Sequence, residues 1–389
     1  MTKINDDKVT FPDQSPVTDA KLDQIRVTLH DVKLSIDKLL TSKAPGIDNI
    51  SPYILKQTKH VIAPILHRLF NRSLFDCRFP SVWKLSNVIP IHKKESRSDP
   101  SNYRPISLTS TLSKVFEKSV SSYLLSYLLS NNLLYEFQSG FLPKHSPTHQ
   151  LIEIYHTIAS NMNNHTATSI VFADISRAFD RLSHRGLYAK MDLYGFSKPV
   201  KDWLISFLSE RKQRVCVNGT YSDWQETHAG VAQGSVIGPI MFLLMINDLP
   251  SHLQSNTRLF ADDTSLIFSH PPSFDITNDI NDEMTRLRQW ADTWMIDLNP
   301  TKTKFMCISP PDNNRVTPSP SFHGTPIEIV DSHKHLGLII NNSLTWKDHI
   351  DYLVTKVSKR IGILRALKFR LTRTCLRTIY MTHIRSVLE

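Results

Sequence analysis

The spacing of apolar residues along the chain predicts helices interspersed with short strands. Apolar residues recur at helical intervals near 19–40, 61–75, 108–130, 148–162, 183–194, 199–209 and 280–294. Runs of β-branched and aromatic residues predict strands near 86–91, 168–174, 214–218, 224–231, 304–308 and 335–340. A wholly apolar helix is expected before Asn247-Asp248. No internal repeat appears, so the elements belong to a non-repetitive fold.

Three of the expected helices carry an apolar stripe, which predicts the face that each one buries. We expect the core to contain Leu22, Ile25, Leu29, Val32, Leu34, Ile36 and Leu39 from the first helix, Ile62, Ile65, Leu66, Leu69 and Phe70 from the second, and Ile280, Met284, Leu287, Trp290 and Trp294 from the helix near 280–294.

Two adjacent acids, Asp262 and Asp263, stand between apolar runs at 259–261 and 265–268, a pattern typical of two strands joined by a tight turn. Such a turn holds both carboxylates near one point, where they repel each other unless a cation lies between them. Asp174 ends the buried strand at 168–174 and is a candidate third ligand. The alternatives are a solvated turn for the pair and a helix cap for Asp174.

Glycine-containing turns form a second group of candidates. The segment Gln138-Ser-Gly-Phe141 either lies against a backbone or ligand, or closes a helix through Gly140. Gly234 and Gly238 either allow a ligand to approach the backbone or only permit tight packing. Asn218-Gly219 is a strong hairpin signal.

Basic residues flank the strand at 86–91. Lys93 and Lys94 follow it, and Arg104 precedes Pro105 within an apolar stretch. Basic centres at the end of one strand and the start of the next element suit an anion such as a triphosphate. The alternative for Lys93 and Lys94 is a solvated face.

Composition narrows the class of protein. A chain of 389 residues is too long for one simple core, so two or three lobes are expected. Hydrophobic residues make up 40% and charged residues 21%, as in globular proteins.

The formal net charge of +10 favours a polyanionic partner. Most of it lies in 351–389, where two helices are expected and nine basic residues oppose Asp351 and Glu389: Lys356, Lys359, Arg360, Arg365, Lys368, Arg370, Arg373, Arg377 and Arg385.

The cysteines, the N-terminal residues and the apolar runs predict the cellular compartment of the protein. Its four cysteines, at positions 77, 216, 307 and 375, form no C-x-x-C pair, which argues against a zinc site or a disulfide scaffold and favours a reducing compartment. No signal peptide opens the chain. The longest apolar run, 236–246, is shorter than the about 20 residues of a membrane span. We therefore expect a soluble, intracellular protein with no membrane partner.

The acids, the glycine turns and the basic residues together suit the joining of nucleotides. In that reaction a 3′-hydroxyl attacks an α-phosphate while two Mg²⁺ ions, about 3.5–4 Å apart, lower the pKa of the hydroxyl and neutralise the leaving oxygens.

Nine short motifs follow one another along the chain: Lys43-Ala-Pro-Gly-Ile-Asp48, Val88-Ile-Pro-Ile91 with Lys93-Lys94, Asn102-Tyr-Arg-Pro-Ile-Ser-Leu108, Gln138-Ser-Gly-Phe141, Phe172-Ala-Asp174 with Ala178-Phe-Asp180, Gly230-Val-Ala-Gln-Gly-Ser-Val-Ile-Gly-Pro239, Phe260-Ala-Asp-Asp263, Leu298-Asn-Pro-Thr-Lys-Thr303 and His335-Leu-Gly337. In this order, from about Lys43 to the end, they resemble the reverse transcriptase of non-LTR retrotransposons, LINE-type and closest to Jockey-like elements.

The resemblance implies an α+β fold, that of a right-hand polymerase with fingers, a palm built on an antiparallel sheet with packed helices, and a partial helical thumb. The expected division is a leader and helix at 1–42, fingers at 43–165, palm at 166–310, the palm end and primer grip at 311–345, and a partial thumb at 346–389.

The resemblance also implies roles for single residues. Asp174, Asp262 and Asp263 match the metal-binding aspartates, with the backbone carbonyl of Ile175 as a further ligand of two Mg²⁺ ions, or of Mn²⁺ as an alternative. The expected contacts of the incoming dNTP are Lys93 or Lys94 and Arg104 at the triphosphate, Phe179 under the sugar, Gln233 and Gly234 beside the base and template, and Lys302 near the pyrophosphate. Leu336 and Gly337 match the primer grip, and Lys356, Lys359, Arg360 and Lys368 are expected to bind nucleic acid.

Two departures from the family pattern remove no chemistry: Arg177 stands where Lys is common, and Ala232 where Pro is usual. Full elements of this kind carry an upstream endonuclease and sequence beyond the thumb, so we interpret the chain as a fragment, a degraded copy or a domesticated gene. The main hypothesis is an RNA-directed DNA polymerase that uses an RNA template, a DNA primer and dNTPs. The alternative is a catalytically inactive nucleic-acid-binding remnant.

Further partners follow from the same resemblance. They are an RNA-binding protein of the element and a separate endonuclease, and the expected location is the nucleus or a cytoplasmic ribonucleoprotein.

Overall fold

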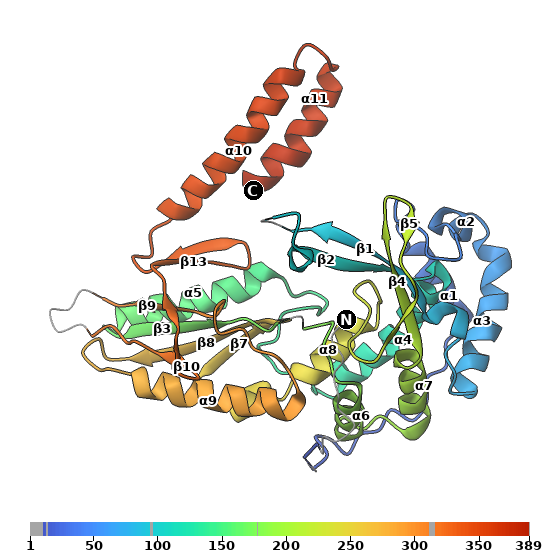
Figure 1. Cartoon of the computed structure of the whole chain (residues 1–389), viewed down its shortest axis with the longest axis horizontal. Coiled ribbons are helices and arrows are strands. Elements are labelled where there is room, and N and C mark those ends of the chain that lie inside the picture. The colour runs from blue at the N-terminus through green and yellow to red at the C-terminus, as the bar shows by residue number, and fades with distance from the viewer. Residues whose placement is uncertain (1–10, 13–14, 94–95, 177, 311–315, 389) are drawn as a thin grey trace.

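The computed structural model describes residues 11–12, 15–93, 96–176, 178–310 and 316–388. Lys94, Arg177 and most of the expected leader therefore lie outside the described residues. Two sheets with their helices form the body of the molecule, and a helical hairpin projects from it (Figure 1). The fold is α+β, as the family resemblance implied.

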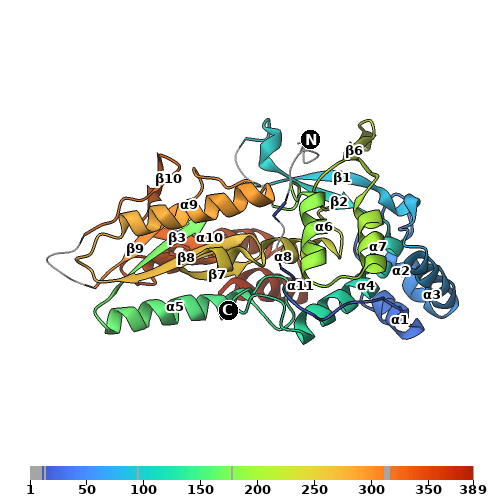
Figure 2. The ribbon, with the colours of Figure 1, turned by 90° about the horizontal axis from the view of Figure 1, so that it is seen from below.

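The larger sheet has the strand order β12-β9-β3-β8-β7. Its central strand β3 is buried along its whole length because helices cover both faces of the sheet, α5 on one side and α9 on the other (Figure 2). The strands β3, β8, β7 and β9 pair antiparallel, and β12 joins β9 in parallel. The bounds are β3 Ala167–Ala173, β7 Asn256–Phe260, β8 Asp263–His270, β9 Lys304–Ile308, β12 Glu328–Ile329, α5 Pro147–Asn163 and α9 Thr277–Trp294.

The second sheet has the order β2-β1-β4-β5, with β6 also paired to β4. β1 pairs antiparallel with β2 and parallel with β4. The hairpin predicted at Asn218-Gly219 is present, with both residues at positive φ (50° and 82°). Its returning strand is divided into β5 and β6 at Ser222, which hydrogen-bonds to Val215. It also ends before the expected 224–231 is complete, because the N–H groups of Gly230 and Val231 donate to the carbonyls of Leu182 and Phe179 instead. The bounds are β1 Leu85–His92, β2 Tyr103–Leu108, β4 Arg211–Val217, β5 Thr220–Tyr221 and β6 Gln225–Thr227.

Helices pack around the second sheet through an aromatic cluster that includes Phe70, Phe116 and Trp203. Phe70 and Phe116 stack with 4.3 Å between their centroids, and all three side chains are buried. The helices and short 3₁₀ turns of this part are α1 Leu29–Asp37, α2 Pro52–Gln57, α3 Lys59–Phe75, η1 Ser81–Lys84, η2 Pro100–Asn102, α4 Thr111–Ser130, α6 His184–Leu193 and α7 Lys198–Leu208.

The wholly apolar helix α8, Gly238–Ile246, lies where the two parts of the body meet (Figure 1). Every residue of α8 except Pro239 is buried, so its first N–H groups need partners inside the protein. Ser235 Oγ supplies one, since it accepts the N–H of Gly238 at 2.8 Å. Just before the helix, the carboxylate of Glu117 in α4 accepts hydrogen bonds from the backbone N–H of Val236 at 2.6 Å and of Ile237 at 3.4 Å. A negative charge at this end of α8 is also favoured by the helix dipole.

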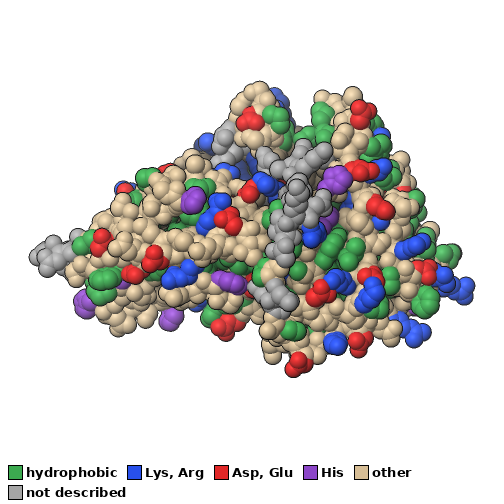
Figure 3. Space-filling view, turned by 60° about the horizontal axis from the view of Figure 1, so that its bottom comes forward, with side chains coloured by type: hydrophobic (Ala, Val, Ile, Leu, Met, Phe, Trp, Pro, Cys, Tyr) green, Lys and Arg blue, Asp and Glu red, His purple; other side chains and the backbone are tan. Residues whose placement is uncertain are grey.

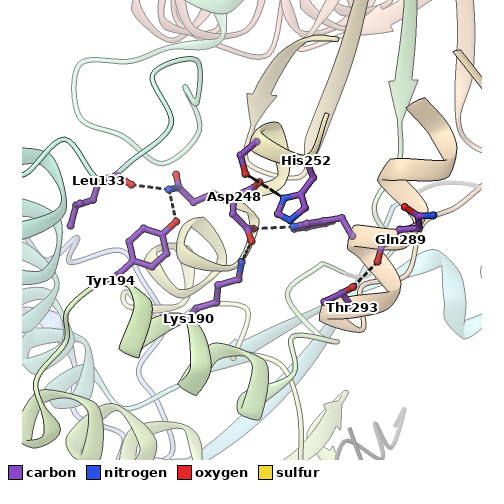
Figure 4. A network of polar contacts seen from close by, with 10 residues as sticks. Leu133, Lys190, Tyr194, Asp248, His252, Gln289 and Thr293 are labelled. Atoms are coloured by element: carbon purple, nitrogen blue, oxygen red, sulfur yellow. Dashed lines mark hydrogen bonds and ion pairs between the residues drawn. The ribbon is translucent and has the colours of Figure 1, made fainter. Parts of the chain in front are cut away.

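A buried ion pair ties α8 to its neighbours (Figure 4). Lys190 of α6 is fully buried, and its ammonium group contacts the carboxylate of Asp248, the residue directly before η3 (Leu249–His252). Asp248 also accepts a hydrogen bond from the indole N–H of Trp290 in α9, at 2.9 Å. The Lys190 ammonium lies 3.6 Å from the ring centroid of Trp294. Burial lowers the pKa of Lys190 to about 8.

The first expected helix begins later than predicted. α1 starts at Leu29 because Thr28 and Asp31 form a capping box, and the preceding segment is extended, with the Leu22 N–H bonded to the carbonyl of Gly195 at 2.9 Å. Three expected core residues are exposed instead, because their side of the helix faces solvent: Leu34, Ile65 and Leu69. The stripe of α9 is buried throughout, as expected.

The stretch 335–340, expected to be one strand, is a hairpin. β13 Ser332–His335 and β14 Leu338–Asn341 pair antiparallel, and Leu336-Gly337 forms the turn at φ 48° and 97°. A smaller pair, β10 Ser321–Phe322 and β11 Thr325–Pro326, precedes it.

The basic segment forms the projecting hairpin of α10 Lys347–Leu367 and α11 Arg373–Ile379, continued by a π-helical turn at Tyr380–Arg385 and α12 Ser386–Leu388. Arg360 donates to the carbonyl of His383 and so joins its two arms. Within the part of the chain that the structure describes, no helix is long and apolar enough for a membrane crossing.

Candidate active site

The paired acids lie on the hairpin that the sequence predicted. Ala261 and Asp262 form a two-residue turn between β7 and β8, and Asp263 opens β8 opposite Phe260. Asp174 directly follows β3, whose last residue, Ala173, pairs with Thr264. Because β3 and β8 are neighbours, the three aspartates lie together at one end of the larger sheet.

The carboxylates of this cluster interact electrostatically. Burial, and then the charges of Asp262 and Asp174, raise the pKa of Asp263 to about 6, although this residue reaches solvent. Burial also raises the pKa of Asp174 and of Asp262. Burial disfavours the charged form of these three neighbouring acids, so a cation bound between them would stabilise their ionised form.

Three basic residues lie near these acids: Lys93 and Arg104, expected at the triphosphate, and Lys302, expected near the pyrophosphate from the family resemblance. The charges of Lys302 and Lys93 lower the pKa of Asp174, and the charge of Arg104 lowers that of Asp262, in each case against the larger effect of burial. All three side chains are exposed, so they remain accessible to a ligand.

The position of Lys302 follows from backbone contacts beside Asp174. Ile175 forms an isolated bridge with Leu298, and the N–H of Asn299 donates to the carbonyl of Asp174 at 2.9 Å. The N–H of Lys302 then donates to the carbonyl of Asn299 at 3.3 Å. The turn before β9 therefore begins at the end of β3 and keeps Lys302 at the acid cluster.

Gly234 packs against the strand that carries Arg104. The N–H of Ser107 in β2 donates to the carbonyl of Gln233 at 2.8 Å, and Gly234 has a φ of 138°. A Cβ on Gly234 would lie 2.5 Å from the carbonyl oxygen of Ser107. The same holds for Gly238, where a Cβ would lie 2.7 Å from Ser235 Oγ, so at both glycines the structure shows tight packing.

Phe179 is half-buried between two other rings. It stacks with Phe242 at 5.2 Å between centroids and meets Phe141 edge-on at 5.7 Å. Its carbonyl accepts the N–H of Val231 at 2.8 Å, just before the Gln233 turn.

The turn at Gln138–Phe141 lies against the backbone of the acid hairpin. It is not a helix C-cap, since α4 ends at Ser130 and α5 begins at Pro147. A Cβ on Gly140 would lie 2.1 Å from the backbone nitrogen of Ala261. The sequence left a close approach as one of two interpretations and gave no partner for it; the partner lies more than a hundred residues further along the chain.

Comparison with known proteins decides the family. The family described as "Reverse transcriptase (RNA-dependent DNA polymerase)" matches residues 91–357, which contain all three aspartates and the three basic residues beside them. This chain belongs to the reverse transcriptase family.

Its relatives include polymerases of mobile elements. It is 31% identical to the "RNA-directed DNA polymerase from mobile element jockey" of Drosophila melanogaster and 29% identical to the "Probable RNA-directed DNA polymerase from transposon BS" of the same species. Each match covers 91% of this chain and 40% of the relative. The jockey polymerase of Drosophila funebris is 28% identical over 86% of this chain and 37% of its own length. The resemblance drawn from the motifs is thus confirmed, and the chain spans about two fifths of these relatives.

In this member of the family the β13–β14 hairpin is seated on the larger sheet beside the acids. His333 stacks on Phe172 with 4.1 Å between ring centroids, and His335 approaches Ser265 Oγ at 3.4 Å. Burial lowers the pKa of His335 to about 4. Phe172 and Ser265 each lie two residues from an aspartate of the cluster. The hairpin that ends in the Leu336-Gly337 turn is therefore held on this sheet by the buried ring of His335 and the half-buried ring of His333.

The basic residues of α10 form a surface next to this hairpin. Lys334 of β13 donates to the hydroxyl of Tyr352 at 2.7 Å, and Lys356 lies 5.6 Å from the ring centroid of Tyr352. Lys356, Lys359 and Arg360 line a shallow depression together with Tyr352 and Thr355. On another face of the body, by contrast, acidic and basic side chains are interspersed (Figure 3).

The acid cluster offers oxygen donors, which Mg²⁺ and Mn²⁺ prefer. Among the described residues, no group of three His, Cys, Asp or Glu side chains converges at metal-binding spacing. The four cysteines are free thiols. A cation such as Mg²⁺, which keeps several waters and takes further oxygens from substrate phosphates, fits a donor set of this kind.

Proposed function

We propose that the chain is an RNA-directed DNA polymerase of a non-LTR retrotransposon. One observation carries the proposal: Asp174, Asp262 and Asp263 lie together with raised pKa values, and Lys93, Arg104 and Lys302 are close enough to act on them. Phosphoryl transfer to a 3′-hydroxyl requires acids that bind a metal cation and basic side chains that bind a triphosphate. Both kinds of group are present here.

The three aspartates, with the carbonyl of Ile175, are proposed to hold two Mg²⁺ ions, with Mn²⁺ as an alternative. When bound, such ions lower the pKa of the primer hydroxyl and neutralise the charge that develops on the leaving pyrophosphate. The protein's own part is to fix its carboxylates at the end of two paired strands, so that little reorganisation is needed during the reaction.

The other site residues are proposed to position the substrates. Arg104 and Lys93 bind the triphosphate, and Lys302 stabilises the pyrophosphate as it leaves. Phe179 lies under the sugar of the incoming dNTP, and Gln233 with Gly234 borders the base and the template. The accessibility of Arg104, Lys93 and Lys302 supports the first of these assignments.

Nucleic acid is proposed to contact the hairpins that follow the larger sheet. The Leu336-Gly337 turn holds the primer, and Lys356, Lys359, Arg360 and Lys368 bind the sugar-phosphate backbone. In this scheme residues 43–165 are fingers, 166–310 palm, 311–345 the palm end and 346–389 part of a thumb. An RNA-binding protein of the element and a separate endonuclease are proposed as partners, in the nucleus or a cytoplasmic ribonucleoprotein.

Primer extension tests the proposal. A DNA primer annealed to an RNA template should be extended by the purified chain with dNTPs and Mg²⁺, and chelation by EDTA should stop extension. The Asp262→Asn variant serves as the matched control. If the native chain binds the primed template but gives no more extension than Asp262→Asn with either Mg²⁺ or Mn²⁺, the proposal is wrong and the chain is a non-catalytic nucleic-acid-binding remnant.

A further inference from the structure

The side chain of Gln138 contacts the turn that carries the paired acids. Gln138 is 1% exposed, and its carbonyl Oε1 accepts two hydrogen bonds, from the N–H of Gly140 at 2.7 Å and from the N–H of Ala261 at 3.0 Å. Ala261 immediately precedes Asp262. A buried side chain from a distant segment therefore supplies the acceptor for the backbone of the acid turn.

Backbone contacts fix Gln138 in this place. The N–H of Ser139 donates to the carbonyl of Leu259 at 2.9 Å, and the N–H of Leu259 donates to the carbonyl of Phe137 at 3.1 Å. These bonds add a short parallel bridge to the outer edge of β7. Gly140 then passes so close to Ala261 that any side chain at position 140 would collide with its backbone.

Ala261 needs such support because of its own conformation. Its φ is 55°, in the left-handed region that residues other than glycine rarely adopt, and it is buried. A buried N–H without a partner is strongly unfavourable. If Gln138 did not accept this N–H, the turn would tend to relax to another conformation, and Asp262 and Asp263 would change direction with it.

The amide group of Gln138 has a further property. Its Nε2 is buried and makes no hydrogen bond to any described residue, although Oε1 accepts two. An apolar side chain of the same length would fill this space without an unpaired donor. The glutamine is therefore needed here for its acceptor rather than for its volume.

We propose that Gln138 is a positioning residue for the acid pair, whose side-chain carbonyl holds the Ala261 turn so that Asp262 and Asp263 lie beside Asp174. The role of that arrangement in metal-dependent catalysis rests on the function proposed above. The hydrogen bond and its effect on the turn are independent of that proposed function.

Hydrogen exchange at the Ala261 amide tests the positioning directly. In Gln138→Met the amide loses its acceptor, and its exchange in the substrate-free protein should become about fivefold to tenfold faster, as the loss of one hydrogen bond predicts. Gln138→Glu keeps an oxygen at the same place and should keep the exchange slow.

The chain offers a matched control in Gln150. This glutamine is fully buried in α5, and neither its Oε1 nor its Nε2 has a partner among the described residues. Gln150→Met therefore makes the same chemical change in a buried position without removing a hydrogen bond. Exchange at Ala261 should stay as in the native chain.

Metal binding gives a second measurement. Mn²⁺ affinity, followed by electron paramagnetic resonance without substrate, should fall about fivefold or more in Gln138→Met and stay unchanged in Gln150→Met. In primer extension the Mg²⁺ concentration for half-maximal rate should rise in parallel, while the KM for dNTP changes less than kcat.

Several results would overturn the proposal. These are unchanged Ala261 exchange in Gln138→Met, equal acceleration in Gln150→Met, or faster exchange in Gln138→Glu together with native-like thermal unfolding. Unaltered Mn²⁺ affinity in Gln138→Met would overturn the metal-related part. A chain that shows the expected exchange but extends no primer would refute the proposed polymerase function and leave the positioning of the turn intact.

Discussion

The side-chain amide of Gln233 donates to both carboxylate oxygens of Asp180, each at 2.9 Å. The carbonyl of Gln233 in turn accepts the N–H of Ser107 in β2. Three segments far apart in the sequence are thereby joined: the strand that carries Arg104, the turn that contains Gly234 and the segment that follows Asp174.

Asp262→Asn and Asp174→Asn should each abolish nucleotide incorporation. Each change removes a negative oxygen ligand while keeping the size of the side chain, and because the acids repel one another the fold should be retained. RNA binding should stay nearly native. Primer extension and a binding isotherm measure the two effects, and an Asp262→Asn protein that retains more than a small fraction of native extension would refute the metal-ligand assignment.

The raised pKa of Asp263 predicts how stability depends on pH without metal. A carboxyl whose pKa is higher in the folded chain, here about 6 against an ordinary 3.8, stabilises the fold at low pH, and this contribution is lost as pH rises through about 6. Asp263→Asn should therefore raise the Tm at pH 7.5 by at most a few degrees, since the exposed charge is screened.

Thermal unfolding at two pH values and with added metal checks this relation. The Tm gain of Asp263→Asn should be smaller at pH 4.5, where the Asp263 carboxyl of the folded native chain is already protonated. Saturating Mg²⁺ should reverse the order at pH 7.5, because only the native carboxylate gains from the cation. If the Tm difference between the two proteins changes with neither pH nor metal, the charge of Asp263 is not its cause.

Phe179→Val tests the proposed sugar contact. If the ring lies under the sugar, the smaller side chain should admit ribonucleotides and lower the preference for dNTP over rNTP by about tenfold or more. Its stacking on Phe242 offers the other explanation, plain packing, which predicts lower stability with unchanged discrimination. Competing dNTP and rNTP incorporation, measured beside thermal unfolding for both proteins, distinguishes the two.

Lys190→Met should destabilise the fold by about 3–5 kcal/mol, because it leaves the buried carboxylate of Asp248 without its cation. A second change, Asp248→Asn, should recover part of this loss. Lys201→Met is the control, since its ion pair with Asp192 lies at the surface and should contribute about 1 kcal/mol or less. Urea unfolding gives all these values, and equal effects of the two lysine variants would exclude a special role for the buried pair.

Replacing Lys356, Lys359, Arg360 and Lys368 by Gln should weaken template–primer binding at every sequence. Basic side chains that neutralise phosphates release counterions, so the log–log slope of affinity against salt should flatten by roughly 0.7–0.9 for each phosphate that is no longer neutralised. Because Arg360 also joins the two arms of the hairpin, a triple variant that keeps Arg360 separates the effect of charge from the effect of structure.

Binding isotherms at several salt concentrations measure this slope. Three exposed lysines elsewhere, Lys21, Lys38 and Lys198, changed together to Gln, provide a control of equal charge. A triple variant of the basic hairpin with the slope of this control would show that the hairpin does not hold nucleic acid.

The sequence by itself determined the local elements and the chemistry that they carry. The helices α5 and α9 lie where the helical period of apolar residues put them, because that period reflects which face of a helix is buried. The strands β3, β8 and β9 lie where runs of β-branched and aromatic residues put them. The acids on their hairpin and the order of the motifs were also evident, since each motif is a short, contiguous pattern. These patterns were enough to identify the family, and the match of the family to residues 91–357 confirms it.

Only the tertiary structure decided which residues meet. Local sequence left the Gln138 turn between two interpretations, and its contact with Ala261 depends on the edge of β7, more than a hundred residues away. The start of α1 was mispredicted because the segment before Thr28 is held extended by Gly195. Lys302 lies beside Asp174 only because Leu298 pairs with Ile175. In each case a hydrogen bond to a distant backbone outweighs local preference, and the spacing of apolar residues does not encode that partner.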